Sequence, residues 1–332
     1  MILRRDFLAL TTGGCAIFGW ERTAAAEQSK LSPCRPSYQV RVAHGRRLGV
    51  VEYGDPCGFP VFYFHGQPAC RLEAAILSDH ARTAHCRLIA VDRPGIALSS
   101  PQSRRTILDW ADDVSSLANS VIEEKDSKRS FSIVGFSSGG PYAVACAHRL
   151  RHAGLMRVAI VSGVKSPEFS QVPGGTAGRL FELRRRHPRF ARMLVVGYAR
   201  LCRRRPTAAI HQMTKRMARA DQHLFRNCAY RDAFLQGVHE SMRQGPCGIL
   251  DDGLLLSTCW NIPLGEITLP VSIWHGACDK TVSVAAAHKL AEQIPASHLT
   301  IVANEGHVSL LRSFGTEFLS WLSSGMYDCQ VS

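Results

Sequence analysis

The sequence predicts an α/β fold in which a mostly parallel, doubly wound sheet carries an inserted helical lid. Short apolar runs alternate with helical patterns up to Ser162, which is the rhythm of a doubly wound core. The alternation then stops for about 85 residues and resumes at Val271. The composition, 45% hydrophobic and 20% charged over 332 residues, is ordinary for a globular protein with a sizeable core.

The predicted core begins with an antiparallel hairpin and continues with parallel strands. Polar and apolar residues alternate over 38–42, and a second run follows at 48–53 after a short turn, which predicts two paired strands. The later apolar runs do not alternate, so we expect strands that are buried on both faces of a parallel sheet. These runs lie at 61–64, 88–91, 131–134, 157–162, 271–275 and 299–302. The helical patterns between them are clearest at 106–117, 141–150 and 282–293.

The first 26 residues have the order of an export signal. Arg4 and Arg5 precede a moderately apolar stretch, and three alanines that end at Ala26 provide a cleavage site. The arginine pair and the Asp-Phe-Leu that follows it resemble a twin-arginine signal, so we expect export to the periplasm or beyond. The alternatives are a start that stays attached to the membrane and a lipoprotein anchor at Cys15, whose preceding residues fit such a signal less well.

The predicted lid, 165–250, separates the two parts of the core, 27–164 and 251–332, and carries most of the net charge. Between positions 165 and 243 it holds 17 Lys or Arg residues and five acids, a net charge of +12 in a chain whose total is +13. The basic helices are either solvated surfaces or attract an anionic substrate, an anionic lipid surface or a polyanion. No nucleic-acid-binding fold or aromatic platform accompanies the charge, so we expect no nucleic-acid partner. The five acids are Glu168, Glu182, Asp221, Asp232 and Glu240.

Cysteine spacing and hydropathy limit the kinds of site that the chain can form. The 12 cysteines include no Cys-x-x-Cys pair, which argues against a zinc site and a dense disulfide framework, and we expect no bound metal. No segment after the N-terminal one reaches the roughly 18 consecutive apolar residues that a membrane span needs. We therefore expect no span in the mature chain.

The stretch VGFSSGGPY at 134–142 follows a predicted strand, opens a predicted helix and contains the pattern G-x-S-x-G. In a nucleophile elbow the turn is so tight that the residues two before and two after the serine must be small. Gly135 and Gly139 meet this requirement around Ser137, whereas a phenylalanine would stand in the tight position if Ser138 were the nucleophile. The pattern therefore favours Ser137 as the nucleophile over an ordinary glycine-rich turn.

A nucleophilic serine needs a general base and an acid that orients this base. His307 stands in a loop just after the last predicted strand, and Asp279 stands in the loop after the strand before it. Like Ser137, both fall at the carboxyl ends of parallel strands, where open α/β sheets bind their ligands. The chain order Ser, Asp, His is the one that accompanies such an elbow. The alternatives are a helix N-cap for Asp279 and a capping or buried role for His307.

Two backbone N–H groups are needed to stabilise the oxyanion that forms when the serine attacks. Ser138 follows the nucleophile and is expected to supply one of them. The second is expected from the turn at the end of the 61–64 strand, where Gln67 has an N–H and the following proline has none. In the same turn, His65 and Gly66 are expected to support the donors, His65 by hydrogen bonding.

Four motifs in this order resemble those of the α/β-hydrolase fold family, in particular its esterases and proline iminopeptidases. They are HGQP at 65–68, DRPG at 92–95, GFSSG at 135–139, and GACD at 276–279 together with GH at 306–307. The resemblance covers about residues 38–323 and implies an acyl-enzyme mechanism on a small-molecule acyl substrate, with water as the second nucleophile and no cofactor. One departure is Ile-Ala at 96–97, where many relatives carry a second glycine, and we interpret Asp92 and Arg93 before it as a structural pair near the site.

We therefore expect a Ser-His-Asp hydrolase that cleaves a carboxylic ester or a related acyl bond. An aminopeptidase of the proline-iminopeptidase type would need an acidic pocket for the substrate amine, and the lid has few acids to form one. A non-catalytic ligand-binding protein on the same scaffold is a further alternative, and the presence of all three catalytic residue types argues against it.

Overall fold

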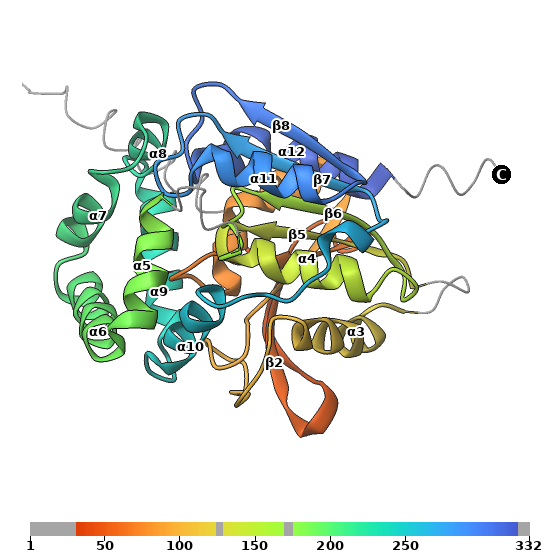
Figure 1. The fold of residues 1–332 in the computed structure, drawn as a ribbon, viewed down its shortest axis with the longest axis horizontal. Helices are drawn as coiled ribbons and strands as arrows, with labels where there is room; N and C mark the ends of the chain where they lie inside the picture. The colour runs from red at the N-terminus through yellow and green to blue at the C-terminus, as the bar shows by residue number, and fades with distance from the viewer. Residues whose placement is uncertain (1–30, 124–128, 169–174, 325–332) are drawn as a thin grey trace, which may run out of the picture.

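The computed structural model describes residues 31–123, 129–168 and 175–324. The predicted export signal at 1–26, with Cys15, lies outside the described residues. Within them, the chain folds around one eight-stranded sheet that is covered by helices on both faces (Figure 1). The predicted fold class, a mostly parallel sheet with an inserted helical region, is confirmed.

The strands lie across the sheet in the order β1-β2-β4-β3-β5-β6-β7-β8. β2 is antiparallel to its neighbours β1 and β4, and the other neighbouring strands are parallel. β1 and β2 form the hairpin that the sequence predicts at the N-terminal end of the core. The bounds are β1 Arg35–Arg41, β2 Arg47–Gly54, β3 Phe59–Phe64, β4 Cys86–Val91, β5 Phe131–Phe136, β6 Leu155–Val161, β7 Val271–Gly276 and β8 Ser297–Val302.

Two apolar cores lie on the two faces of the sheet. Phe62 and Phe64 of β3 enter one core together with α3, α4 and α11, whereas Val61 and Tyr63 enter the other together with η2, α2 and α12. Because both faces are covered, consecutive strand residues are apolar, which explains the lack of alternation in the sequence. The bounds are η1 Ala43–Gly45, η2 Arg71–Leu77, α2 Ser78–Thr83, α3 Asp109–Val121, η3 Ser137–Gly139, α4 Gly140–Arg149, η4 Leu264–Glu266, α11 Val284–Gln293 and α12 Ser309–Ser323.

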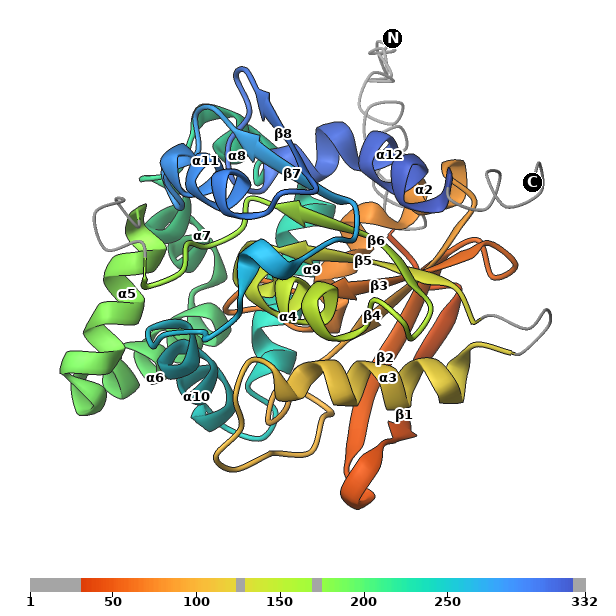
Figure 2. The ribbon, with the colours of Figure 1, turned by 45° about the vertical axis from the view of Figure 1, so that its right-hand side comes forward.

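Six helices, α5 to α10, lie in the chain between β6 and β7 and form the lid. Figure 1 shows α6 and α7 at the outer edge of the molecule, away from the sheet, and Figure 2 shows α5 and α6 there. α10 runs through position 250, where the sequence predicted the end of the lid, so Asp252 belongs to a lid helix. None of the described helices is both long and apolar enough to cross a bilayer. The bounds are α5 Gly175–Arg186, α6 Pro188–Arg204, α7 Pro206–Thr214, α8 Arg219–Leu224, α9 Cys228–Ser241 and α10 Cys247–Leu256.

Candidate active site

Ser137 stands at the sharp turn between β5 and α4, in a backbone conformation with φ of 52°. This left-handed conformation is strained for a residue with a side chain and is typical of a nucleophile elbow. The flanking glycines leave no room for larger residues. A Cβ atom added to Gly135 would lie 2.7 Å from the Cβ of Ala143, and one added to Gly139 would overlap the carbonyl oxygen of Phe64. The folded turn therefore requires small residues two before and two after Ser137, as the sequence analysis assumed when it favoured Ser137 over Ser138.

The structure brings the three predicted residues into one hydrogen-bonded chain. His307 Nε2 lies 2.9 Å from Ser137 Oγ, and His307 Nδ1 lies 2.7 Å from Asp279 Oδ2. Ser137 follows β5, Asp279 follows β7 and His307 follows β8, so the carboxyl ends of three parallel strands supply the side chains. Ser137 is 6% exposed and His307 is 5% exposed, so the site is nearly covered.

Asp279 has a second structural role in the turn that leads to α11. Its Oδ1 accepts the backbone N–H groups of Thr281 and Val282 at 2.7 and 2.9 Å. The N-cap of α11 is Ser283, whose hydroxyl accepts the N–H of Ala285, so Asp279 is not that cap. The turn fixes the carboxylate and leaves Oδ2 for His307.

The electrostatics of the pair favour a charged imidazole beside a charged carboxylate. Burial by itself would raise the pKa of Asp279, but His307 and its hydrogen bond outweigh burial and hold this pKa below its usual value. Burial by itself would lower the pKa of His307, but Asp279 outweighs burial and raises it, and Asp221 and Glu73 add to the rise. An imidazolium that forms at His307 is thus stabilised where it stands.

A second histidine, His275, contacts the same carboxylate, and the sequence analysis did not single it out. Its Nε2 lies 3.2 Å from the carbonyl oxygen of Val282 and 3.3 Å from Asp279 Oδ2. Burial lowers the pKa of His275, although Asp279 opposes this change. His275 is therefore neutral near pH 7 and supports the position of Asp279.

The predicted oxyanion turn lies against the nucleophile. A Cβ atom added to Gly66 would lie 3.3 Å from the Cβ of Ser137. The Gly66 N–H donates to Glu73 Oε2 at 2.7 Å, and His65 Nδ1 lies 2.8 Å from the Gly66 carbonyl oxygen. Burial and the neighbouring Arg93 hold the pKa of His65 well below its usual value, so a neutral His65 supports the turn. The N–H of Gln67 has no acceptor in the described parts of the chain, which leaves it free for a ligand.

The lid fixes this turn through Asp252, a residue that the sequence analysis missed. Its carboxylate accepts from Gln67 Nε2 at 2.9 Å, and from the buried Arg93, Arg105 and Tyr142. Burial by itself would raise the pKa of Asp252, but the two arginines outweigh burial and hold it below its usual value. No sequence pattern links α10 to the turn at 65–68, so only the fold reveals this cluster.

Arg93 ties the cluster to both loops of the site. It donates to the carbonyl oxygen of His65, and its Nη2 donates to Ser138 Oγ at 3.3 Å. The predicted pairing of Asp92 with Arg93 is wrong, because Asp92 instead forms an ion pair with Arg71 at 2.7 Å. Asp92 and Arg93 are adjacent in the chain, but each has its own partner in the fold.

The lid also holds the loop that carries His307. Asp221 of α8 is fully buried and accepts three consecutive N–H groups, those of His307, Val308 and Ser309, at 3.0, 2.8 and 2.9 Å. These groups lie at the start of α12, where a helix has unpaired donors. In the sequence, Asp221 stands out only as one of the five acids between 165 and 243. Its contact with the loop 86 residues away has no signal in the sequence.

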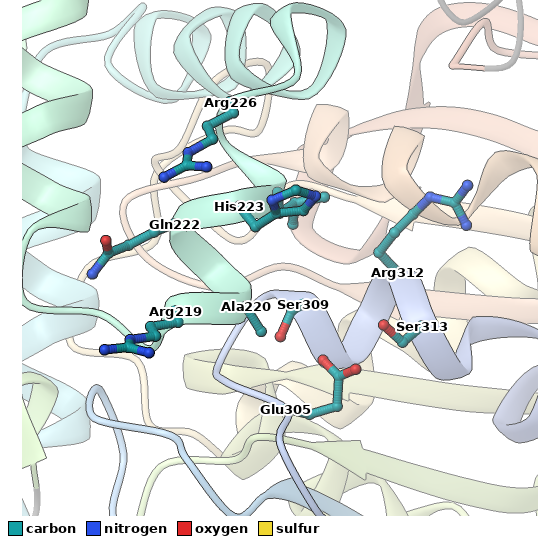
Figure 3. Close-up of a pocket in the computed structure, with 10 residues that line it drawn as sticks. Arg219, Ala220, Gln222, His223, Arg226, Glu305, Ser309, Arg312 and Ser313 are labelled. Carbon is teal, nitrogen blue, oxygen red and sulfur yellow. The ribbon is translucent and has the colours of Figure 1, made fainter.

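A hollow of about 680 Å³ lies beside α8 and the start of α12 (Figure 3). Arg219, Arg226 and Arg312 line it together with Glu305. Figure 3 shows the guanidinium groups of Arg219 and Arg226 on one side of the view and that of Arg312 on the other, so the three cations do not converge. Ser137 is not among the lining residues, so this hollow is not the candidate active site. In the described residues, no three His, Cys, Asp or Glu side chains are grouped so that they could hold a metal ion.

Comparisons with known proteins agree with this fold. Residues 58–319 match the model of the alpha/beta hydrolase family. Similar solved structures include an esterase from Exiguobacterium antarcticum, 17% identical with a TM-score of 0.62, where 88% of this chain and 100% of that chain are covered. An esterase from Rhodococcus sp. ECU1013 is 20% identical with a TM-score of 0.61, covering 88% and 98%. A bromoperoxidase from Bacillus anthracis is 19% identical with a TM-score of 0.58, covering 89% and 100%.

A search of curated protein sequences gives no match. The solved structures share the fold at low identity, and their names cover more than one reaction, so they do not decide the chemistry of this chain. The family match, in contrast, spans most of the chain and includes all three residues of the hydrogen-bonded chain. The protein is therefore a member of the alpha/beta hydrolase family.

Proposed function

We propose that the protein is a serine hydrolase that cleaves a carboxylic ester. The observation that carries this proposal is the hydrogen-bonded chain from Ser137 through His307 to Asp279, at 2.9 and 2.7 Å. A serine hydroxyl is unreactive near neutral pH unless a base takes its proton. Here the base is within reach of the hydroxyl and is itself oriented by a buried carboxylate.

In the proposed mechanism, Ser137 Oγ attacks the ester carbonyl carbon while its proton passes to His307 Nε2. The oxyanion that forms accepts hydrogen bonds from the N–H groups of Ser138 and Gln67. His307 then gives its proton to the leaving alcohol, and an acyl-enzyme remains on Ser137. A water molecule then attacks the acyl carbon while its proton passes to His307. The bond between the acyl carbon and Ser137 Oγ breaks, Oγ takes the proton back from His307, and the acid is released.

The partners of the lid acids favour an ester over the aminopeptidase alternative. A free amine of a substrate would need a carboxylate that is not already bonded. Each of the five lid acids already accepts from a neighbour, Asp221 from three backbone N–H groups and the other four from arginine side chains or a backbone N–H. In α10, Asp252 accepts from Gln67, Arg93, Arg105 and Tyr142, and Asp251 is exposed to solvent. The described part of the lid thus offers few carboxylates that could recognise an amine, and we propose ester cleavage.

Covalent labelling by a fluorophosphonate probe, together with hydrolysis of short p-nitrophenyl esters, tests the proposal. The wild type is expected to be labelled and to turn over, and Ser137→Ala is expected to lose both. Ser138→Ala is the matched control, since it keeps the backbone N–H and removes only a hydroxyl that accepts from Arg93. Labelling that survives in Ser137→Ala would contradict the assignment, and a folded wild type with neither labelling nor turnover would favour a binding protein.

We also propose that the chain is exported, on the strength of Arg4 and Arg5 before an apolar stretch. Replacing both with lysine should leave the protein in the cytoplasm of a Gram-negative host, whereas the wild type should appear in the periplasmic fraction. Arg41→Lys with Arg47→Lys is the matched control, because both arginines are exposed strand residues of the folded domain. Equal distribution of all three proteins would contradict export by this route.

A further inference from the structure

The outer part of the lid is an arginine-rich hairpin, formed by α5 and α6 over residues 175–205. It contains ten arginines and one acid, Glu182, a net charge of +9 in a chain whose total is +13. Glu182 is already paired with Arg185 and Arg186. The hairpin therefore has no further acid of its own to balance its remaining positive charge. Figure 2 shows both helices at the outer edge of the lid, and Figure 1 shows α6 there.

Large apolar side chains are exposed on the same hairpin. On α6, Phe190, Met193 and Leu194 are 48%, 58% and 41% exposed, and on α5, Leu180 is 55% exposed. The three α6 residues are spaced i, i+3 and i+4, so they form one stripe along the helix. A stripe of this kind on a soluble surface marks a binding face, because isolated apolar residues are common but contiguous ones are not.

Over the first two turns of α6, the apolar stripe is not the side that packs on the protein. Further along the helix, Leu201 continues the stripe and packs against a buried cluster. The buried residues Ala191 and Cys202 lie about a quarter turn or more to one side of it, by the 3.6-residue repeat of a helix. Arg189, Arg200 and Arg203 lie on the other side of the stripe by the same repeat. The helix thus presents three faces, of which one is buried, one is apolar and exposed, and one is basic.

We infer that this hairpin docks the protein on an anionic lipid surface, with the apolar stripe at the headgroup boundary and the arginines against the lipid phosphates. A helix that lies in a membrane interface combines these two features, a basic polar face and exposed large apolar residues. A second copy of the chain is a poor occupant, because an isologous contact would bring two surfaces of net charge +9 together. A nucleic acid would neutralise the arginines but would leave the stripe of Phe190, Met193 and Leu194 exposed to water.

The docked surface belongs to the element that covers the candidate active site. At the start of α5, Thr176 Oγ1 donates to the carbonyl oxygen of Lys280 at 3.3 Å, and the Ala177 N–H donates to that of Thr281 at 3.1 Å. These two carbonyls are in the loop of Asp279. Further along α5, Phe181 and the side chain of Gln67 both lie 3.8 Å from a Cβ added to Gly253. Docking through the outer side of the hairpin would therefore hold the site close to the lipid surface.

Sedimentation of the full-length chain with lipid vesicles tests this inference. We expect binding to mixed vesicles of phosphatidylglycerol and phosphatidylcholine, at least tenfold weaker binding to phosphatidylcholine alone, and loss of binding as NaCl rises from about 0.1 M to about 1 M. Arg189→Gln with Arg200→Gln and Arg203→Gln, the three arginines of the basic face, should weaken binding about 100-fold. Phe190→Ser with Met193→Ser should weaken it at least tenfold.

The matched control is Arg41→Gln with Arg47→Gln and Arg149→Gln, which removes the same charge from exposed positions outside the lid and should bind within about twofold of the wild type. All these variants share the same first 30 residues, so any contribution of that segment is common to them. Hydrolysis of a soluble ester and the urea midpoint, expected to match the wild type, show that each variant is folded. Equal binding by the hairpin and control variants would overturn the inference, as would binding to a DNA duplex in the absence of vesicle binding. Vesicle binding that is insensitive to the two serine substitutions would also overturn it, because the stripe would then play no part.

Discussion

The contact of Asp221 with the His307 loop predicts that a lid acid controls the proposed catalytic base. Replacing Asp221 with asparagine keeps the shape of the side chain and one acceptor oxygen. If that oxygen takes the place of Oδ1, it still accepts the N–H groups of Val308 and Ser309. The new NH₂ group then takes the place of Oδ2, where it meets the N–H of His307 and cannot accept its hydrogen bond. One buried N–H then lacks an acceptor, which costs about 1–3 kcal/mol of stability.

The hydrogen bond that is lost is made by the backbone N–H of His307 itself, so the substitution should lower the rate of ester hydrolysis as well as the stability. Displacement of a catalytic group by about 1 Å costs on the order of 10²-fold in rate, and we expect kcat/KM for a short p-nitrophenyl ester to fall about 10-fold to 100-fold. KM should change little, because Asp221 is buried behind the loop and does not face the substrate. Urea denaturation measures the loss in the free energy of unfolding separately.

The dependence of kcat/KM on pH tests the charge of Asp221, because a change in packing alone would not shift it. His307 must be neutral to accept the proton of Ser137, so kcat/KM rises with pH through the pKa of His307. Asp279, Asp221 and Glu73 raise this pKa, against burial, and the neighbouring His275 is neutral. Removing the charge of Asp221 should therefore shift the acidic limb of the profile to lower pH.

Asp232→Asn is the matched control, since Asp232 is an exposed lid acid whose contact is with Arg231. It should leave the stability within about 0.5 kcal/mol of the wild type and the profile unchanged. A variant Asp221→Asn with the kcat and the acidic limb of the wild type would refute the reasoning.

Three further perturbations test other parts of the site. Asp279→Asn should lower kcat about 10⁴-fold with the fold intact, as measured by ester hydrolysis and urea denaturation, and a loss below tenfold would contradict its role. Arg93→Met should lower the free energy of unfolding, measured by urea denaturation, by about 3–5 kcal/mol, because the buried carboxylate of Asp252 loses a positively charged partner. The double variant with Asp252→Asn should recover part of that loss, because the unpaired charge is removed. Gly139→Ala should lower the free energy of unfolding by about 1–3 kcal/mol and abolish labelling of Ser137, because the added Cβ overlaps the Phe64 carbonyl oxygen. The control is Gly237→Ala in α9, where the added Cβ has open space and should raise the free energy of unfolding by up to about 1 kcal/mol.

The parts of the site that follow from local sterics and strand topology could be predicted from the sequence. Gly135 and Gly139 identify Ser137 because the tight turn is made by neighbours in the chain. Asp279 and His307 follow because the ends of parallel strands meet at one edge of a sheet.

The supporting residues could not be predicted, because they depend on how distant elements pack. Asp221 is the only acid of α8, and Asp252 follows Asp251 in α10. Neither helix carries a sequence motif, and the partners of both acids lie in loops far along the chain. The wrong pairing of Asp92 with Arg93 has the same cause. Adjacent residues at the end of a strand point in different directions, so each finds a partner on another element.

The two buried lid acids attach the insertion to both loops of the candidate site, Asp252 to the turn of Gln67 and Asp221 to the turn of His307. The insertion is thus not an exchangeable module. Replacing it with the lid of another family member would leave both loops without their anchors, unless carboxylates were introduced at the corresponding places. Changes to this lid that alter substrate preference are therefore expected to keep these two fixed points, which limits where its helices can lengthen, shorten or rotate.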